Sequence, residues 1–383
     1  MKISCVIPLY HAEKYIIETL DSLRAQTYPL DEILVIDDCG NDRSAQLVEV
    51  YSETYPIVRL IRQSHNQGGS AARNRGLKEA ANAWVLMMDA DDTIHPELLA
   101  KQIELLHSAG DVDPAPVCVH PAYVQTDAEG TILNNSEYRG QQLSFDKTFA
   151  ALLIRNYIIT PSGLLLNRDA ALTIGGYRTT IFISEDAEFI LRLARKGTFL
   201  YLDEPYVYFR RHPMSITSDL NKASKAGQAI LDIYSMDEIK HAIFDRDYSE
   251  QQNRFDFATL LYQYQRYDEG FKALEQVTED EFAESKLFLQ AVFYLENQQW
   301  QQAKLLLEKL LNKEPTHGAA LNNRAVLYAM DGEYEQAVLL WQQALQLFPG
   351  YMDALDNLRA IDNTLTEYRF TKRELRANLL RYS

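Results

Sequence analysis

The sequence has few cysteines and no long apolar run. It contains three cysteines in 383 residues, and their odd number and wide spacing indicate neither a disulfide framework nor a zinc site. No stretch approaches the ~20 consecutive apolar residues that a membrane-spanning helix needs. The first residues pass directly into a strand-like segment, without the architecture of a signal peptide. We therefore expect a cytoplasmic protein with no transmembrane segment.

Positive charge is scarce as well. The chain has 38 Lys and Arg against 54 Asp and Glu, which gives a formal net charge of −16. Nucleic-acid binding needs a basic face that neutralises phosphates, so this balance argues against nucleic acid as a partner. The apolar fraction of 46% and the charged fraction of 24% are those of an ordinary globular protein. Long disordered regions are therefore not expected.

The N-terminal part of the chain alternates between strand-length apolar runs and amphipathic stretches. The apolar runs lie at 3–7, 32–36, 58–61 and 84–88, and the stretches with helical spacing lie at 13–26, 44–55, 70–81 and 96–108. This alternation predicts an α/β domain in which a mostly parallel sheet has helices on both faces. Further strands are predicted at 117–124 and 162–167, and a helix at 186–196. Sheets of this kind bind ligands beyond the carboxyl ends of their strands.

Acidic residues stand at two of these strand ends. Asp37 and Asp38 follow the second apolar run, and Asp89 and Asp91 follow the fourth. Because side chains alternate in an extended segment, Asp89 and Asp91 are expected on the same side of the chain. Two carboxylates together with substrate phosphates are a usual way to hold Mg²⁺ or Mn²⁺. Such a DxD triplet also fits a solvated turn, so its position after a strand is what favours a site.

The C-terminal third repeats itself. The segment WQQA at 300–303 recurs as YEQA at 334–337, and the same offset relates Pro315 to Pro349. This pattern resembles the tetratricopeptide repeat, a helix pair with a period of about 34 residues. We predict three parts: an α/β domain at 1–220, a helical linker at 221–250 and a helical repeat domain at 251–383.

Two roles remain open for the repeats and two for the tail. The repeats can pack on the N-terminal domain or form a homodimer, or they can bind a polypeptide on a concave surface. The tail carries five basic residues, which are Arg369, Lys372, Arg373, Arg376 and Arg381. A basic amphipathic helix can lie on the anionic inner face of a membrane. A capping helix with a solvated face is the alternative.

Four segments in order resemble glycosyltransferase family 2. They are VIPLYHAEKY at 6–15, VIDDCGND at 35–42, NQGGSAARNRG at 66–76 and MDADD at 88–92. The resemblance continues through GGY at 175–177, SED at 184–186 and YFRRH at 208–212, so it covers about residues 1–218. It departs at His11, where the family often has Asn, and at 39–41, in place of a Gly-Ser turn. It implies a GT-A fold and transfer with inversion at the anomeric carbon.

The resemblance also implies residue roles. The donor nucleotide sugar would be bound by residues of the first four segments, which are Pro8, Tyr10, Glu13, Asp38, Asn66, Gly69, Arg73, Asp89 and Ala90. Asp38 would accept a hydrogen bond from the base, which in this family is usually uracil. Asp91 would ligate Mn²⁺ or Mg²⁺, with Asp89 and His212 beside the metal. Asp186 would be the general base. An aspartate with an ordinary pKa is ionised at neutral pH, so its positioning is expected to matter more than its pKa.

Each role has a structural alternative. Asp38 can cap a turn, Asp186 can be an acid favoured at a helix N-terminus, and Arg73 can be an ordinary helix residue. The predicted function is transfer of a sugar from a UDP-sugar to an acceptor in surface polysaccharide or glycan synthesis. The alternatives are glycosylation of a polypeptide held by the repeats, or an inactive domain that serves as a scaffold. A nucleotidyltransferase would have a glycine-rich basic loop after the first strand, and residues 8–14 are not such a loop. The sugar and the acceptor stay open.

Overall fold

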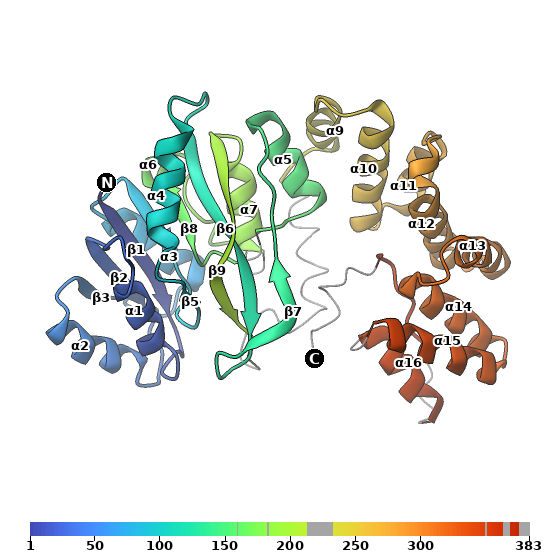
Figure 1. Cartoon of the computed structure of the whole chain (residues 1–383), viewed down its shortest axis with the longest axis horizontal. Helices are drawn as coiled ribbons and strands as arrows, with labels where there is room; N and C mark the ends of the chain where they lie inside the picture. The colour runs from blue at the N-terminus through green and yellow to red at the C-terminus, as the bar shows by residue number, and fades with distance from the viewer. Residues whose placement is uncertain (159, 182–183, 213–232, 349–350, 363–367, 375–383) are drawn as a thin grey trace. The chain divides into compact units, whose positions relative to one another are not determined.

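The structure is a computed structural model of the chain, and it divides into two compact units. It describes residues 1–158, 160–181, 184–212, 233–348, 351–362 and 368–374. The first unit is Met1–Ser235 and the second is Met236–Ser383. The strands lie in the first unit and a run of helices forms the second (Figure 1). Residues 221–232 of the predicted linker at 221–250 lie outside the described residues, and α9, Met236–Phe244, falls within the remainder.

The strands of the first unit form one mixed sheet. In chain order they are β1 Ile3–Leu9, β2 Glu32–Asp37, β3 Val58–Arg62, β4 Trp84–Met87, β5 Thr93–Ile94, β6 Pro116–Thr126, β7 Ile132–Tyr138, β8 Leu164–Asn167 and β9 Thr198–Arg210. Their order across the sheet is β3-β2-β1-β4-β8-β6-β9-β5, with β7 beside β6. The first four strands pair in parallel, as predicted, and so do β6 and β9. β8 is antiparallel to both β4 and β6, which makes the sheet mixed.

Helices cover both faces of this sheet, which confirms the predicted fold class. They are α1 Ile16–Arg24, α2 Ser44–Thr54, α3 Gly69–Glu79, α4 Leu98–Ala109, α5 Phe145–Ile154, α6 Arg168–Thr173 and α7 Glu185–Leu193. Side chains alternate along β1, so Ile3, Cys5 and Ile7 join one core with residues of α1 and α4. Val6 faces the other way and lies under Gly76 of α3. Both faces of β1 are therefore buried.

Gly76 lets α3 approach β1 closely. A Cβ atom at this position would lie 2.2 Å from Cγ1 of Val6, which is fully buried. We expect Gly76→Ala to lower the free energy of unfolding by about 1–3 kcal/mol through overpacking. Urea unfolding measures the loss. The same substitution should cost less in a Val6→Ala background, where the clashing methyl groups are gone. Equal costs in the two backgrounds would contradict this packing.

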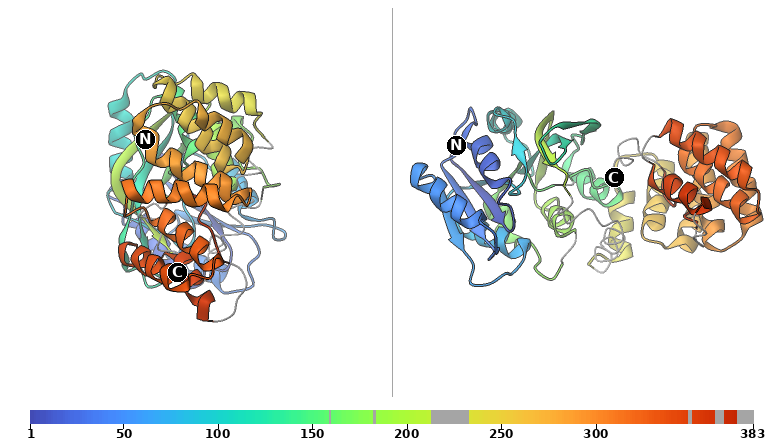
Figure 2. Two further views of the ribbon diagram at one scale, coloured as in Figure 1. Left: turned by 90° about the vertical axis from the view of Figure 1, so that its right-hand side faces the viewer. Right: turned by 90° about the horizontal axis from the view of Figure 1, so that it is seen from below.

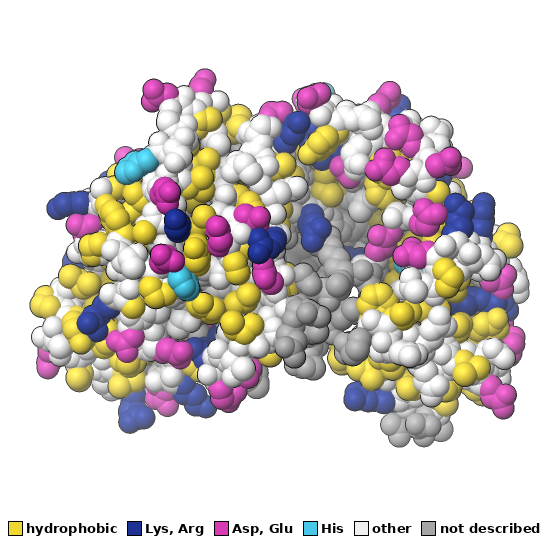
Figure 3. Space-filling view, in the orientation of Figure 1, with side chains coloured by type: hydrophobic (Ala, Val, Ile, Leu, Met, Phe, Trp, Pro, Cys, Tyr) yellow, Lys and Arg dark blue, Asp and Glu magenta, His cyan; other side chains and the backbone are white. Residues whose placement is uncertain are grey.

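The second unit is a stack of helices (Figure 2). They are α9, α10 Glu250–Gln263, α11 Tyr267–Glu275, α12 Ala283–Glu296, α13 Trp300–Lys313, α14 Gly318–Met330, α15 Tyr334–Leu347 and α16 Met352–Asp362, with a 3-10 turn at Asp280–Phe282. α12 packs on α13 and α14 packs on α15. Ala303 and Ala337, related by the predicted offset, are both fully buried. Acidic side chains are frequent over α11 and α12 on the face seen in Figure 3.

Helix length bears on the expectation about membranes. Among the residues that the structure describes, no helix combines the length and the apolar character that crossing a bilayer requires. In the tail, residues 368–374 form neither a helix nor a strand. Arg376 and Arg381 lie outside the described residues, so contact of the tail with a membrane stays a prediction.

Candidate active site

The structure brings the sequence-predicted residues together in three groups near the carboxyl ends of β1, β2 and β4. One group pairs Asp91 with His212. The second surrounds Arg73, which contacts carboxylates from the end of β4 and from the start of α7. The third joins Asp38 to the loop before α3. Segments that are far apart in the chain thus meet at the carboxyl ends of these strands.

Asp91 and His212 form a pair that can share a divalent cation. Oδ2 of Asp91 lies 2.8 Å from Nε2 of His212. The His212 ring lies beside the Tyr15 ring, with their centroids 4.9 Å apart. A carboxylate and an imidazole are compatible with Mn²⁺. No group of three or more His, Cys, Asp or Glu that could hold a metal occurs in the described part of the chain. The pair therefore fits a cation whose other ligands come from phosphates and water.

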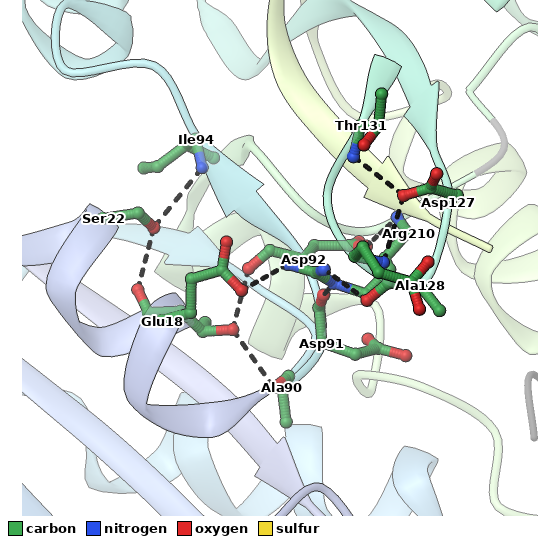
Figure 4. A network of polar contacts seen from close by, with 12 residues as sticks. Glu18, Ser22, Ala90, Asp91, Asp92, Ile94, Asp127, Ala128, Thr131 and Arg210 are labelled. Carbon is green, nitrogen blue, oxygen red and sulfur yellow. Dashed lines mark hydrogen bonds and ion pairs between the residues drawn. The ribbon is translucent and has the colours of Figure 1, made fainter. Parts of the chain in front are cut away.

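A network around Arg210 fixes the end of β9 against the loop that carries Asp91 (Figure 4). The Arg210 backbone N–H donates to Oδ1 of Asp92, and its Nε donates to the backbone oxygen of Asp91, both at 2.8 Å. Its Nη2 forms an ion pair with Glu18 of α1 at 2.6 Å. Because His212 follows two residues later, the network also holds His212 at Asp91. The Asp91 carboxylate points away from the network and contacts His212 instead.

Glu18, Asp92 and Arg210 were not among the predicted site residues. Asp92 is fully buried, and its Oδ2 accepts a hydrogen bond from Ser162. Burial raises the pKa of Asp92 well above its usual range, and the charges of Asp91 and Asp89 raise it further. The inward position of Asp92 could have been predicted from the alternation of side chains in an extended segment. Asp92 follows Asp91 directly, so its side chain takes the opposite, inward side. The inward carboxylate positions β9, and the outward one is available to a ligand.

Arg73 is surrounded by carboxylates. Its Nη2 lies 2.7 Å from Oδ1 of Asp89, and its Nη1 lies 3.3 Å from Glu185 and 3.7 Å from Asp186. The guanidinium is nearly buried, and a Cβ atom on Gly69 would lie 3.2 Å from Nη1. Gly69 therefore leaves room for the charge. The two carboxylates of the DxD triplet have different partners, Arg73 for the first and His212 for the second. Contact of Asp89 with a metal and of Arg73 with a nucleotide stay predictions.

Asp186 has a shifted pKa. Burial raises the pKa of Asp186 to about 7; Arg73 lowers it, and the charges of Glu185 and Asp89 raise it. Its Oδ1 is buried and has no hydrogen-bond partner among the residues that the structure describes. The expectation of an ordinary pKa at this position is therefore wrong, because the carboxyl is desolvated. A carboxylate whose pKa lies near the working pH is well suited to general-base chemistry.

This pKa predicts how activity depends on pH. A protonated Asp186 cannot accept a proton, so kcat/KM should fall as the pH drops below about 7. Glu185→Gln removes a negative charge that raises the pKa of Asp186, so the acid limb of the profile should move to lower pH. Glu104→Gln, at an exposed position on α4, is the matched control and should leave the limb in place. Profiles that coincide for wild type and Glu185→Gln would contradict this electrostatic coupling.

Asp38 organises the loop before α3. Its carboxylate accepts hydrogen bonds from the backbone N–H of Gln67 at 2.7 Å and of Gly68 at 2.8 Å, and from the side chain of Gln63 at 2.6 Å. Gly68 has φ +85°, a left-handed conformation that favours glycine. The side chain of Asp38 thus has a structural role in this loop, similar to the alternative in which Asp38 caps a turn. Its predicted contact with a base is not tested by these bonds.

Glu13 also has protein partners. Its Oε2 accepts from the backbone N–H of Arg43 at 3.0 Å, and its own N–H donates to Asp42 at 3.1 Å. These bonds tie the chain after β1 to the start of α2. By contrast, Tyr10 is 51% exposed and stacks on His11, with ring centroids 4.0 Å apart. Glu13 therefore shapes the loop, and the Tyr10 ring is available to a ligand.

The remaining predicted donor residues differ in exposure. Asn66 is exposed, and Pro8 is half-buried in β1. Ala90 is buried, and its backbone oxygen accepts a hydrogen bond from Thr19 of α1 at 3.1 Å. Asn66 can therefore meet a ligand by its side chain, whereas Ala90 supports the loop between the two aspartates.

The comparisons with known families agree with this architecture. Residues 4–174 match the model of glycosyl transferase family 2. Residues 287–317 and 318–351 each match a tetratricopeptide repeat model. The N-terminal unit therefore carries a family 2 glycosyltransferase domain, and the C-terminal unit carries tetratricopeptide repeats. Both resemblances noted in the sequence are confirmed.

Several glycosyltransferases are similar to parts of the chain. An uncharacterized glycosyltransferase of Haemophilus influenzae is 27% identical over 236 residues, which cover 61% of this chain and 76% of that protein. The poly(ribitol-phosphate) beta-N-acetylglucosaminyltransferase TarS of Staphylococcus aureus is 39% identical over 101 residues, which cover 26% of this chain and only 18% of TarS. The relatives that share these segments with the chain are glycosyltransferases.

A solved structure shares the fold. The crystal structure of S. aureus TarS 1–349 in complex with UDP-GlcNAc aligns with a TM-score of 0.51 over 91% of this chain and 93% of that one. At 19% sequence identity this likeness concerns the fold alone. The expected GT-A fold followed by a helical region is thereby confirmed.

Proposed function

We propose that the chain is an inverting glycosyltransferase that moves a sugar from a UDP-sugar to an acceptor hydroxyl in cell-surface glycan synthesis. The observation that carries this proposal is that the two aspartates of the DxD triplet contact two different groups. Asp91 contacts His212. Asp89 contacts Arg73, which also lies beside Asp186. Sugar transfer needs one group that stabilises the leaving diphosphate and, beside it, a second group that accepts the proton of the attacking hydroxyl. The name of TarS, an N-acetylglucosaminyltransferase acting on poly(ribitol-phosphate), supports the acceptor class, and the crystal structure of TarS 1–349 with UDP-GlcNAc supports the donor class.

Asp186 takes the acceptor proton in this mechanism. The acceptor oxygen forms a bond to the anomeric carbon while the bond from that carbon to the diphosphate oxygen breaks. The proton of the acceptor passes to the Asp186 carboxylate, and UDP leaves from the opposite side, which inverts the configuration. Arg73 keeps a positive charge beside Asp186 and so favours its ionised form before the proton arrives.

The other residues hold the donor. A divalent cation, Mn²⁺ or Mg²⁺, would be held by Asp91 and His212 and would neutralise charge on the departing diphosphate. The exposed ring of Tyr10 offers a face on which a uracil base can stack. The loop that Asp38 organises borders the same strand ends.

A panel of nucleotide sugars tests the proposal. The full chain is incubated with UDP-, GDP-, ADP- and dTDP-sugars, and release of the nucleoside diphosphate is followed with Mn²⁺, with Mg²⁺ and with a chelator. We expect slow release from one UDP-sugar that stops on chelation. Preference for another nucleotide would contradict the UDP assignment. No release from any donor, together with no nucleotide binding, would favour the scaffold alternative.

A further inference from the structure

The GGY segment at 175–177 has no role in the proposed mechanism so far. Gly175 and Gly176 follow α6 with φ +85° and +68°, left-handed conformations that favour glycine. A Cβ atom on Gly176 would also lie 2.2 Å from Oδ1 of Asn74 in α3. The two glycines therefore let the chain turn closely past α3. The turn delivers Tyr177 to the interior, where this residue is 2% exposed.

Tyr177 is held by both helices that carry the charged groups of the site. The carboxamide of Asn74, the neighbour of Arg73 in α3, accepts from the Tyr177 backbone N–H and donates to the Tyr177 backbone oxygen, both at 2.7 Å. The Tyr177 ring stacks on Phe189 of α7, with centroids 4.0 Å apart and an interplanar angle of 7°. Cζ of Arg73 lies 5.5 Å from the centroid of the same ring. The ring therefore has a fixed place beside Arg73 and the helix that begins with Asp186.

Three buried polar atoms of this cluster have no hydrogen-bond partner among the described residues. They are the hydroxyl oxygen of Tyr177, Nε of Arg73 and Oδ1 of Asp186. The first two can donate a hydrogen bond and the third can accept one. Oδ1 of Asp186 lies 3.7 Å from Nη1 of Arg73, which is too long for a hydrogen bond. Catalytic hydrogen bonds are often long or misaligned without substrate and tighten when it binds. Three such atoms in one cluster therefore indicate bonds that are made in the substrate complex.

Electrostatics associates the Tyr177 hydroxyl with Asp186. Burial raises the pKa of Tyr177 well above its usual range, and the charge of Asp186 is the next cause; Arg73 lowers the pKa, and Asp89 and Glu185 raise it. The Asp186 side chain keeps 24% exposure although its Oδ1 is buried. Oδ2 is therefore the oxygen that an acceptor can reach, and Oδ1 is the oxygen that faces the interior.

Packing does not explain why residue 177 is a tyrosine. Phenylalanine would keep the ring contacts, and burying a hydroxyl without a partner is unfavourable. Tyr262 of α10 also buries an unpartnered hydroxyl, but it lies in a hydrophobic cluster and its titratable neighbours are tyrosines. Tyr177 differs from Tyr262 because its unpartnered hydroxyl lies with unpartnered atoms of two charged residues.

We propose that Tyr177 is a positioning residue for the general base: in the substrate complex its hydroxyl donates a hydrogen bond to Oδ1 of Asp186 and so directs Oδ2 towards the attacking hydroxyl. Tyr177 keeps its proton throughout, and the acceptor proton passes to Asp186 alone. The two glycines and Asn74 serve this role by fixing the ring. The proposal rests on the proposed function, because it requires Asp186 to act as the base.

Tyr177→Phe tests the hydroxyl, because it removes this group and keeps the ring. Hydrolysis of the UDP-sugar found in the panel is measured with the full chain, together with calorimetric titration of UDP and thermal unfolding. We expect kcat to fall by about 10-fold or more, because a hydrogen bond to a charged group is lost. The KM for the donor and the UDP affinity should stay near those of wild type. Tm should stay at or above that of wild type, because no bond of the substrate-free fold is lost.

Tyr262→Phe is the matched control, since it removes a buried, unpartnered hydroxyl in the repeats and should leave kcat unchanged. A wild-type kcat in Tyr177→Phe would overturn the proposal. A clear fall in Tm would also overturn it, because the hydroxyl would then be bonded in the substrate-free fold. Weaker UDP binding at unchanged kcat would assign the hydroxyl to the donor instead. No turnover by the wild-type chain with any donor would contradict the proposed function itself, and with it this role of Tyr177.

Discussion

Asp186→Asn is expected to lower kcat by about 10²-fold or more while donor affinity stays near that of wild type. Asparagine keeps the shape of the side chain but cannot accept a proton at neutral pH. In the proposed mechanism the donor is held mainly by the pair of Asp91 and His212 and by the ring of Tyr10, none of which the substitution changes. Steady-state kinetics with the UDP-sugar found in the panel, together with calorimetric titration of UDP, separates turnover from binding.

The matched control is Asp169→Asn. Asp169 also lies in the first turn of its helix, α6, but is 74% exposed. The same substitution there should leave kcat unchanged. Turnover of Asp186→Asn within a few-fold of wild type would show that another residue is the base. The residue would then be an acid favoured by the N-terminus of α7.

Asp91→Asn is expected to abolish transfer and to weaken UDP binding in the presence of Mn²⁺. The substitution removes the negative charge opposite His212 that would hold the cation. A loss of charge stabilisation of several kcal/mol in the transition state corresponds to a rate loss of about 10³-fold or more. Kinetics and UDP titrations, each with Mn²⁺ and with a chelator, measure the effect.

Specific controls accompany this variant. Asp111→Asn, at an exposed position after α4, should behave as wild type. UDP affinity in the chelator should be similar for wild type and Asp91→Asn, because the carboxylate acts through the cation. Wild-type transfer that survives exhaustive chelation would exclude the metal-dependent mechanism.

Local sequence patterns were sufficient for the strands and helices from β1 to β4 and for α4, but not for the short strand β5 between them. The periodicity of apolar residues there is repeated over whole strands and helices, and each predicted strand from β1 to β4 was confirmed. β9, Thr198–Arg210, was not predicted. Asp203, Glu204 and Pro205 interrupt its apolar pattern, and its register against β6 shifts between Pro121 and Tyr123. Only pairing with a strand distant in the chain makes it a single long strand.

The residue types of the site were readable from motifs, but their partners were not. The pair of Asp91 and His212 was expected from family resemblance alone, across 121 residues of chain. The salt bridges of Arg73 with Asp89 and Glu185 depend on how the fold brings α3, the end of β4 and the start of α7 together, which no local pattern encodes. The raised pKa of Asp186 likewise follows from burial by tertiary structure.

In the repeats, a usable signal was present but overlooked. The repeat offset was recognised from alanines and prolines, and the same offset relates Asn323 to Asn357. Asparagine is unfavourable inside helices, so its recurrence at one repeat position indicates a role other than helix formation. The basic residues Arg369 and Lys372 were interpreted as part of a helix, yet they lie in the irregular segment that these asparagines hold.

The proposed donor and metal site at the carboxyl ends of the strands is tested most directly by a crystal structure of the chain with UDP and Mn²⁺. Anomalous diffraction is recorded at the manganese absorption edge. The expected result is a manganese peak bonded to the carboxylate of Asp91 and to Nε2 of His212, with the UDP diphosphate on the metal and Asp186 beside the vacant sugar position. A manganese peak away from both Asp91 and His212, or a UDP molecule bound at a different edge of the sheet, would contradict it.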